Sequence, residues 1–234
     1  MTSQDKSYNF DFFSIAFSVD NVIFGFDSSE IKVLLIKRSF DPFKDMWALP
    51  GDLVLPDEDL RNAPKRVLKE LTGLDNVYLE QVKTFGKVNR HPRGRVVTVA
   101  YYSLININEV NPVADSFAQE VEWHPLSSIQ ELAFDHLEIM NTCLARLQSQ
   151  VKLQPIGFEL LPEKFTLSEL QDLYEAILNK KLDKRNFRKK IMSLKVLKDN
   201  HEYQQGVAHR PAKLYAFDKE KFETIKSEGI HFEI

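Results

Sequence analysis

The sequence contains a single cysteine, Cys143, among its 234 residues. One cysteine excludes an internal disulfide framework and any zinc site built from several cysteines, and it indicates a reducing compartment such as the cytoplasm. The N-terminus, MTSQDKSYNF, has no long apolar run, so we expect neither a signal peptide nor a membrane anchor. Internal repeats and low-complexity tracts are also missing. What remains is an ordinary globular chain, whose apolar content of 43% is sufficient for a sizeable core.

The net charge of −3 conceals an asymmetry along the chain. Residues 151–234 contain 16 Lys and Arg against 13 Asp and Glu, a net charge of +3, which leaves −6 for the first 150 residues. Opposite charges in the two parts indicate two domains with different partners. We therefore expect one domain over residues 1–150 and a second over residues 151–234.

Alternating and apolar segments predict a mixed α/β structure for the first domain. Asp27 begins a turn between two strands, which makes a hairpin. Gly73 is expected to end one helix, and Asp135 to cap the start of another. Residues 148–155 read as a polar joint between the domains. The expected strands cover residues 13–26, 31–36, 77–86, 95–105 and 121–124, and the expected helices cover 60–72 and 135–147.

The segment WALPGDLVLPDEDLRNAPKRVLKELTGL, from Trp47 to Leu74, has the layout of a strand end, a Gly/Pro turn, a loop and a helix. It resembles the Nudix box, whose pattern is G-x5-E-x7-R-E-U-x-E-E-x-G-U, with U a bulky apolar residue. Laid on that pattern, Asp52 takes the place of the leading Gly, and Glu58, Arg66 and Gly73 match the Glu, Arg and Gly that follow. The resemblance implies an α/β/α sandwich.

The carboxylates of the Nudix helix are incomplete in this sequence. In the family they hold a divalent metal against a diphosphate, and such metals prefer oxygen ligands. Positions three and four apart share a helix face, but Val67 and Leu71 supply no oxygen, which leaves Glu70 alone. Asp52 also disfavours a positive φ at the turn. We therefore expect no hydrolysis, no catalytic residue, no metal and no cofactor. The simpler alternative is a purely amphipathic helix that packs on a core.

The second domain has the pattern of a winged helix. Thr166 and Glu169 form a capping box at the start of one helix, and Asp183 caps the next. Two strands, over residues 196–203 and 213–217, follow and are joined by a loop. Helix, turn, helix and hairpin together predict a winged helix-turn-helix.

The second helix of this motif is strongly basic. Residues 180–190 carry seven basic side chains and one acid, and core-facing Phe187 and Ile191 direct their neighbours outward. Winged helices present this helix to the major groove, where Arg and Asn read bases and Lys contacts phosphate. The alternative is an ordinary solvated basic face. The residues expected to contact double-stranded operator DNA are Lys184, Arg185, Asn186, Arg188 and Lys189 in the helix, and His209 and Arg210 in the wing.

The segments FTLSELQDLYEAI, LDKRNFRKKI and HRPAKLYAF, combined with the degenerate Nudix box, resemble the Nudix-related transcriptional regulators, the NrtR family. The resemblance implies a catalytically inactive sensor domain, a homodimer, and release of operator DNA when a small effector binds. The family's effectors are ADP-ribose or, in a sugar-utilisation branch, a sugar such as L-arabinose. The stretches IGFELLPEKFTLSELQDLYEAI and AYYSLININE look closest to the sugar branch.

The effector pocket is predicted from polar and aromatic residues near the strand ends. Trp47 is able to stack a sugar ring or an adenine, or to be buried core, and the loop over residues 87–94 either closes over a ligand or is solvated. The expected effector-binding residues are Arg38, Trp47, Glu70, Asn89, Arg95, Tyr102 and His136. An alternative function is an active Nudix hydrolase of nucleoside diphosphate compounds with an accessory nucleic-acid domain, against which Val67 and Leu71 argue. A plain interaction scaffold leaves the basic helix unexplained.

Overall fold

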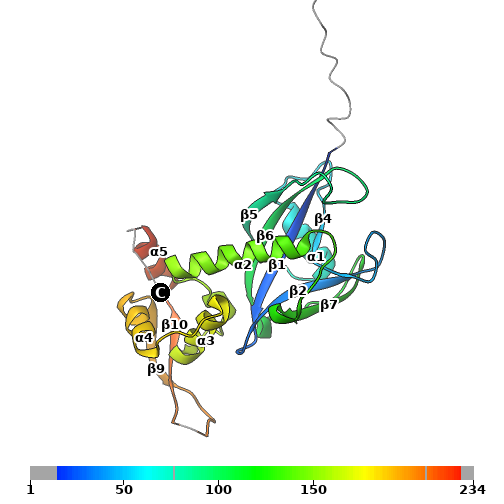
Figure 1. Cartoon of the computed structure of the whole chain (residues 1–234). Helices are drawn as coiled ribbons and strands as arrows, with labels where there is room; N and C mark the ends of the chain where they lie inside the picture. Colours follow the sequence, from blue (N-terminus) through cyan, green and yellow to red (C-terminus); the bar gives the residue numbers. More distant parts are fainter. Residues whose placement is uncertain (1–14, 76, 209, 228–234) are drawn as a thin grey trace, which may run out of the picture.

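The computed structural model describes residues 15–75, 77–208 and 210–227. A large sheet with a helix on each face is followed by a smaller helical part that carries a hairpin (Figure 1). Within the described residues, no helix is both long enough and apolar enough to cross a membrane. The strands of the large sheet are β1 (Ala16–Phe26), β2 (Ile31–Arg38), β3 (Trp47–Ala48), β4 (Gly51–Leu53), β5 (Glu80–Phe85), β6 (Val96–Asn106) and β7 (Ala118–Pro125).

Strand β1 is the centre of the large sheet. It runs parallel to β6 along its whole length and antiparallel to β2, while β4 pairs with its first residues. The predicted hairpin is confirmed, and the Asp27 carboxylate accepts hydrogen bonds from the backbone N–H groups of Ser29 and Glu30, both at 3.0 Å. Because both faces of β1 are covered, every residue from Ser18 to Phe26 is buried, polar residues included.

The two faces of the sheet pack against different helices. Val22 and Phe24 of β1 share an apolar cluster with Ile139 of α2 (His136–Leu153), whereas Val19 shares a cluster with Val67 and Leu71 of α1 (Ala63–Thr72). Alternate residues of a strand point to opposite faces, so these helices cover opposite sides. The predicted α/β/α sandwich is confirmed.

Helix α1 ends where predicted but begins later. Gly73 has φ 71° and donates its N–H to the Lys69 carbonyl, which closes the helix. The expected start near Leu60 is wrong, because the helix begins at Ala63. Pro64 lacks an N–H and is tolerated only in the first turn, so an earlier start would place it in the helix interior.

Helix α2 is longer than predicted. It continues to Leu153, so the polar joint expected over residues 148–155 is wrong, and the expected boundary at residue 150 falls within the helix. Leu147 and Val151 are both fully buried and lie four residues apart, which keeps one apolar stripe while the polar side chains face outward. Leu147 and Val151 pack against the C-terminal part. Beside them, Gln148 Nε2 donates a hydrogen bond to the Ile177 carbonyl at 2.9 Å.

The C-terminal part is the predicted winged helix. Thr166 and Glu169 form both hydrogen bonds of the capping box, and Asp183 accepts a bond from the Asn186 N–H at 2.8 Å. Phe158 and Leu170 share one apolar cluster with the C-terminal half of α2, so the two parts have a continuous core. The elements are α3 (Leu167–Leu178), α4 (Lys184–Ser193), β8 (Phe165–Thr166), β9 (Leu197–Tyr203), β10 (Lys213–Phe217) and the unexpected α5 (Lys219–Ser227).

Candidate functional site

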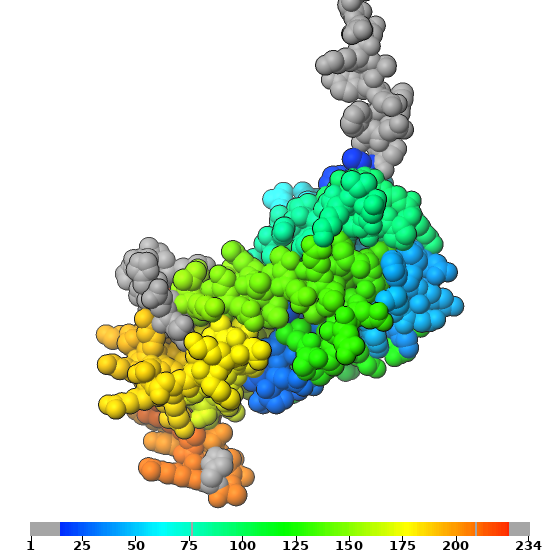
Figure 2. Space-filling view, viewed as in Figure 1, coloured from blue at the N-terminus to red at the C-terminus, as the bar shows by residue number. Residues whose placement is uncertain are grey.

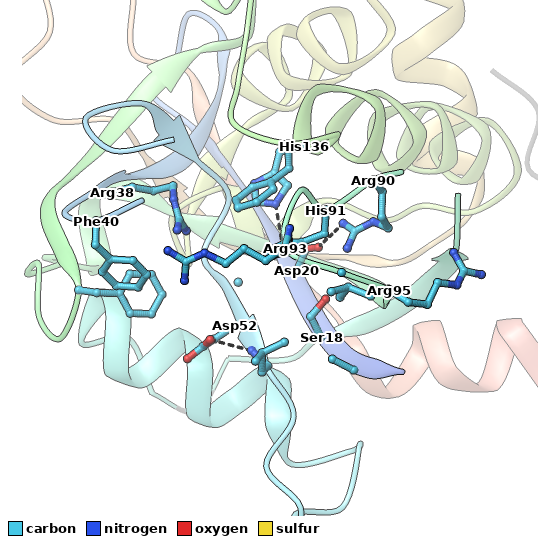
Figure 3. Close-up of a pocket in the computed structure, with 17 residues that line it drawn as sticks. Ser18, Asp20, Arg38, Phe40, Asp52, Arg90, His91, Arg93, Arg95 and His136 are labelled. Atoms are coloured by element: carbon cyan, nitrogen blue, oxygen red, sulfur yellow. Dashed lines mark hydrogen bonds and ion pairs between the residues drawn. The ribbon is translucent and has the colours of Figure 1, made fainter. Parts of the chain in front are cut away.

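A cavity of about 370 Å³ opens at the edge of the sandwich where β1 and β6 begin. Its walls come from the starts of β1 and β4, the loops after β2 and β5, and the N-terminus of α2 (Figure 3). Predicted effector residues Arg38, Arg95 and His136 meet here. The other lining residues are Ala16, Ser18, Asp20, Phe40, Gly51, Asp52, Leu53, Arg90, His91, Arg93, Gly94, Val96, Phe117 and Phe134.

A buried carboxylate forms the floor of the cavity. Asp20 accepts a hydrogen bond from Thr98 Oγ1 at 2.7 Å and from Arg90 Nη2 at 3.4 Å. Arg90 also donates two hydrogen bonds to the carboxylate of Asp135, the residue before α2, from Nε at 2.9 Å and from Nη2 at 2.7 Å. Burial opposes ionisation of Asp20, but His136, Arg90 and Thr98 outweigh it and hold its pKa below the ordinary value. The floor is therefore a compensated charge network.

His136 completes this network and is held in one tautomer. The backbone N–H of Leu49 donates to Nδ1 at 3.0 Å, so that nitrogen carries no proton, and Nε2 lies 3.3 Å from Asp20 Oδ1. Nε2 is thus the protonated nitrogen and faces the carboxylate. Because both ring nitrogens already have partners, His136 contributes the face of its ring to the wall, and neither nitrogen is available to a ligand.

Positive charge exceeds negative charge around the cavity. Four guanidinium groups, those of Arg38, Arg90, Arg93 and Arg95, surround two carboxylates, those of Asp20 and Asp52. Burial raises the pKa of Asp52, and the nearby Glu70 raises it further, whereas Arg66 and Arg38 act in the opposite direction. The cavity is therefore suited to an anionic ligand.

Aromatic side chains form one wall. Phe40 and Phe117 have ring centroids 5.1 Å apart, and His91 stacks on Phe134 at 5.2 Å with an interplanar angle of 12°. Burial lowers the pKa of His91, and the neighbouring arginines Arg90, Arg38 and Arg93 lower it further, so its ring is neutral at pH 7. This wall offers flat apolar surface to a planar ring of a ligand.

Four predicted effector residues lie outside the cavity. Trp47 packs edge-on against His124 at 4.3 Å, Glu70 binds Arg66 on the outer side of α1, and Asn89 is exposed on its loop. The Tyr102 hydroxyl contacts Glu80 and Gln150. Tyr102 lies six residues beyond Val96, which is about 20 Å along a strand, and this separates it from the cavity mouth.

Most of the residues that line the cavity were not predicted from the sequence. The loop over residues 87–94 was expected either to close over a ligand or to be solvated, and its Arg90, His91 and Arg93 line the cavity. Asp20 was not singled out. A charged residue in a strand that is buried on both faces requires partners, and this requirement marks Asp20 as a candidate site residue.

The Nudix-type helix does not fit a divalent metal. Arg66 contacts Glu58 at 2.7 Å and Glu70 at 2.8 Å, so the two carboxylates share a guanidinium group, and its hydrogen bond lowers the pKa of Glu58. Val67 and Leu71 are buried in the apolar cluster beneath the helix. Among the residues placed by the structure, no group of three or more His, Cys, Asp or Glu side chains is arranged to hold a metal ion.

Helix α4 presents a basic surface. Lys184, Arg185, Asn186 and Lys189 are exposed, while Phe187 and Ile191 are buried against α3. In Figure 2 the yellow and orange segments that contain α4 project their side chains away from the N-terminal part. These four side chains are exposed, as a DNA-contacting face requires, and their contact with DNA stays a prediction.

Two of the expected DNA contacts differ from this pattern. Arg188 was expected to point outward, but it is only partly exposed, and its Nη2 donates to Ser168 Oγ on α3 at 3.0 Å. Position 188 borders the buried stripe of Phe187 and Ile191, which turns its side chain toward the neighbouring helix. Arg210 is exposed in the wing, whereas His209 lies outside the described residues.

Comparisons with known proteins agree with this architecture. Residues 16–145 match the family model of the NUDIX domain, and residues 157–217 match the NrtR DNA-binding winged helix domain. The chain is 36% identical over 217 residues to the ADPR responsive transcriptional repressor NtrR of Acinetobacter baylyi, a match that covers 91% of this chain and 86% of that repressor.

Solved structures give the same result. The crystal structure of Shewanella oneidensis NrtR complexed with a 27mer DNA superposes with a TM-score of 0.75 at 32% identity, covering 88% of this chain and 95% of that chain. The NUDIX domain of the same Shewanella protein, cocrystallised with ADP ribose, gives a TM-score of 0.55 at 34% identity and covers 63% of this chain and 99% of that chain. Both domains are thus matched in their expected order, and the chain belongs to the Nudix-related transcriptional regulator (NrtR) family.

Proposed function

We propose that the protein is a homodimeric transcriptional repressor of the cytoplasm that binds operator DNA through its winged helix and is released by ADP-ribose bound in the Nudix domain. The observation that carries the proposal is a cavity with excess guanidinium groups and an aromatic wall, in the same chain as the exposed basic face of α4. ADP-ribose combines a charged diphosphate with a planar base, which are the two features that this cavity complements.

The cavity favours ADP-ribose over a sugar. An uncharged pentose such as L-arabinose brings no charge to balance the guanidinium groups, and buried charges without a partner are costly. The Acinetobacter repressor is named for its response to ADPR, and the Shewanella domain was crystallised with ADP ribose. These observations support the nucleotide effector and give no support to the sugar-utilisation branch expected from the sequence.

The DNA contacts are assigned to α4 and the wing. Arg185 and Asn186 are exposed and would read bases in a major groove, and the exposed Lys184 and Lys189 would neutralise phosphates. A single winged helix makes few base contacts, so two copies related by a two-fold axis would read two half-sites of a nearly palindromic operator.

Helix α2 is the proposed connection between the two sites. His136 lines the cavity and Asp135 holds Arg90, while at the other end of the helix Leu147 and Val151 belong to the apolar cluster that includes the core of the winged helix. A displacement at the N-terminus of α2 would therefore reach the core that α2 shares with α3. Effector and operator would favour different placements of the winged helix, which gives the two ligands opposing effects.

The test is calorimetry on the full-length protein with ADP-ribose, in the absence and presence of operator DNA. We expect operator to weaken ADP-ribose binding roughly 5- to 150-fold, the usual range of allosteric coupling. Linkage requires ADP-ribose to weaken operator binding by the same factor. Equal affinities in the two titrations, or tighter binding of L-arabinose than of ADP-ribose, would refute the proposed effector mechanism.

Two further measurements complete the test. Because Val67 and Leu71 supply no metal ligand, we expect no Mg²⁺-dependent release of AMP from ADP-ribose. Steady AMP production that is abolished by Glu70→Gln would favour the hydrolase instead. Light scattering should give a dimer, and a monomer that still binds operator as one subunit would contradict the two-fold arrangement.

A further inference from the structure

Resting on the proposed function, we infer that Arg38 and Arg93 form a clamp for two linked phosphate groups, positioned by the backbone carbonyls of Asp41 and Pro42, and that this clamp makes the cavity selective for a diphosphate. Arg38 is the last residue of β2, Asp41 and Pro42 lie in the loop that follows it, and Arg93 lies in the loop after β5, which meets them at the cavity. The clamp names the residues that would recognise the charged centre of the effector.

Arg38 is a buried cation that forms no ion pair with any carboxylate among the described residues. The residue is only 7% exposed, and its Nε donates to the Pro42 carbonyl at 2.9 Å. Its guanidinium carbon lies 4.9 Å from the ring centroid of Phe134 and 5.1 Å from that of Phe40. Neither terminal nitrogen, Nη1 or Nη2, forms a hydrogen bond or ion pair with any residue that the structure describes. Arginine is seldom buried unless it is paired.

Arg93 reaches the same place from the opposite loop. It is exposed, and its Nη2 donates to the Asp41 carbonyl at 2.6 Å, so consecutive carbonyls of one loop hold the two guanidinium groups. Figure 3 shows the Arg93 guanidinium beside that of Arg38. Burial lowers the pKa of Arg38, and the nearby charge of Arg93 lowers it further, whereas Asp52 and Asp20 partly offset both effects.

The loop that supplies the carbonyls is held in a defined shape. Asp45 donates its N–H to the Arg38 carbonyl at 2.9 Å, and Arg38 donates its own N–H to the Met46 carbonyl at 3.1 Å. Phe43 and Asp45 both have φ of 64°, a conformation uncommon for residues other than glycine. Such strained positions occur where the surrounding structure fixes a functional geometry.

Two adjacent guanidinium groups repel each other in an empty cavity and are stabilised when an anion lies between them. The planar fork of arginine matches phosphate oxygens with paired hydrogen bonds. Arg90 is excluded from this role, because Asp20 and Asp135 already neutralise it. Arg38 and Arg93 thus provide one fork for each phosphate of a diphosphate, whereas a monophosphate would satisfy only one.

The experiment is calorimetry with ADP-ribose, ADP, AMP and adenosine, a series with two, two, one and no phosphate groups. Arg38→Met and Arg93→Met are compared with wild type and with Arg61→Met, which removes a charge that is 88% exposed and outside the cavity. We expect each clamp variant to bind ADP-ribose and ADP roughly tenfold or more weakly, the effect of losing a charge-assisted pair. Binding of adenosine should change by less than about twofold, because it makes no phosphate contact.

Unchanged thermal denaturation and unchanged operator binding without effector would exclude misfolding of Arg38→Met, and the exposed Arg93 provides an independent test. Equal losses for ADP and adenosine, or no loss in either variant, would overturn the clamp. If wild type binds ADP through these arginines but does not bind ADP-ribose, the proposed effector is wrong while the clamp is retained. If wild type binds ADP-ribose and both variants bind it equally well, the clamp is wrong while the effector is retained.

Discussion

Gly51→Ala tests whether the charge network beneath the cavity depends on the close approach of β4 to β1. Gly51 pairs with Asp20 across the two strands. A methyl group built at Gly51 would lie 2.0 Å from Asp20 Oδ1 and 2.9 Å from the Val19 carbonyl oxygen. Since such carbon atoms essentially never approach another atom closer than 3.0 Å, the carboxylate would have to move by about 1 Å.

The expected loss of stability follows from the groups that hold the Asp20 carboxylate in place. Asp20 is 4% exposed and is bound by Thr98 at 2.7 Å, by His136 at 3.3 Å and by Arg90 at 3.4 Å. A shift of that size breaks part of this set and leaves buried charges without partners. Breaking a buried ion pair typically costs about 3–5 kcal/mol, so we expect the free energy of unfolding to fall by that amount.

Urea denaturation at pH 7 measures this change. Both tryptophans, Trp47 and Trp123, lie in the Nudix domain, so their fluorescence reports the unfolding of that part. Gly86→Ala is the matched control, because its methyl group would lie 3.8 Å from the nearest side chain, and we expect a change within about 0.5 kcal/mol.

A second comparison isolates the role of the carboxylate. In an Asp20→Ala background, Gly51→Ala should cost clearly less, since the clashing oxygen is absent and the two changes are coupled. The reasoning is refuted if Gly51→Ala is as stable as wild type. It is also refuted if the full cost persists in the Asp20→Ala background, because the clash would then involve the backbone.

Three other predictions concern the winged helix and the helix that supports it. Arg185→Ala should weaken operator binding by about 1–3 kcal/mol if the residue reads a base, with ADP-ribose affinity unchanged in the free protein, as measured by fluorescence anisotropy and calorimetry. Hydrogen bonds from Lys181, Leu182 and Gln171 lower the pKa of Glu175 from 4.5 to about 2, so the stabilisation is present above pH 4.5 and is lost as the pH falls toward 2. Glu175→Gln should therefore destabilise the protein at pH 7 and differ little from wild type near pH 2, and an equal difference at both pH values would contradict the assignment. Leu147→Ala should lower the unfolding free energy by about 2–5 kcal/mol, because the side chain is fully buried, and a urea midpoint equal to that of wild type would contradict its place in the shared core.

Local signals in the sequence were sufficient to predict most of the helices and strands. Thr166 and Glu169 identified the start of α3, and Gly73 identified the end of α1, because caps and left-handed glycines act within a few residues. The C-terminal extension of α2 was not predicted, because the signal for it is not local. Gln148 and its polar neighbours resemble a linker until Leu147 and Val151 are recognised as a stripe that needs a partner, and that partner lies in the other domain.

The cavity was harder to predict than the fold because no local rule describes it. Arg38, Gly51, Arg90 and His136 come from four separate segments, and the pairing of β1 with β2, β4 and β6 is what brings most of these segments to one edge of the sheet. Residue type alone selected Tyr102 and Trp47, which are polar or aromatic but lie elsewhere in the sheet. The exposed face of α4 was predictable, because helical periodicity separates buried Phe187 from its basic neighbours without tertiary information.

The two anion-binding surfaces proposed here differ in their physical basis. Arg38 is almost fully buried and Asp52 and Asp20 offset its charge only in part, so a bound anion would complete the compensation, whereas Arg185 is solvated and would gain chiefly by releasing counterions from DNA. The surfaces lie toward opposite ends of α2, whose 18 residues span about 27 Å. ADP-ribose bound in the cavity, as proposed, would therefore not occupy the cations that would hold operator DNA. In the proposed mechanism, release of the operator would then be transmitted through the protein, and α2 contacts both regions, with His136 at one end and Val151 at the other.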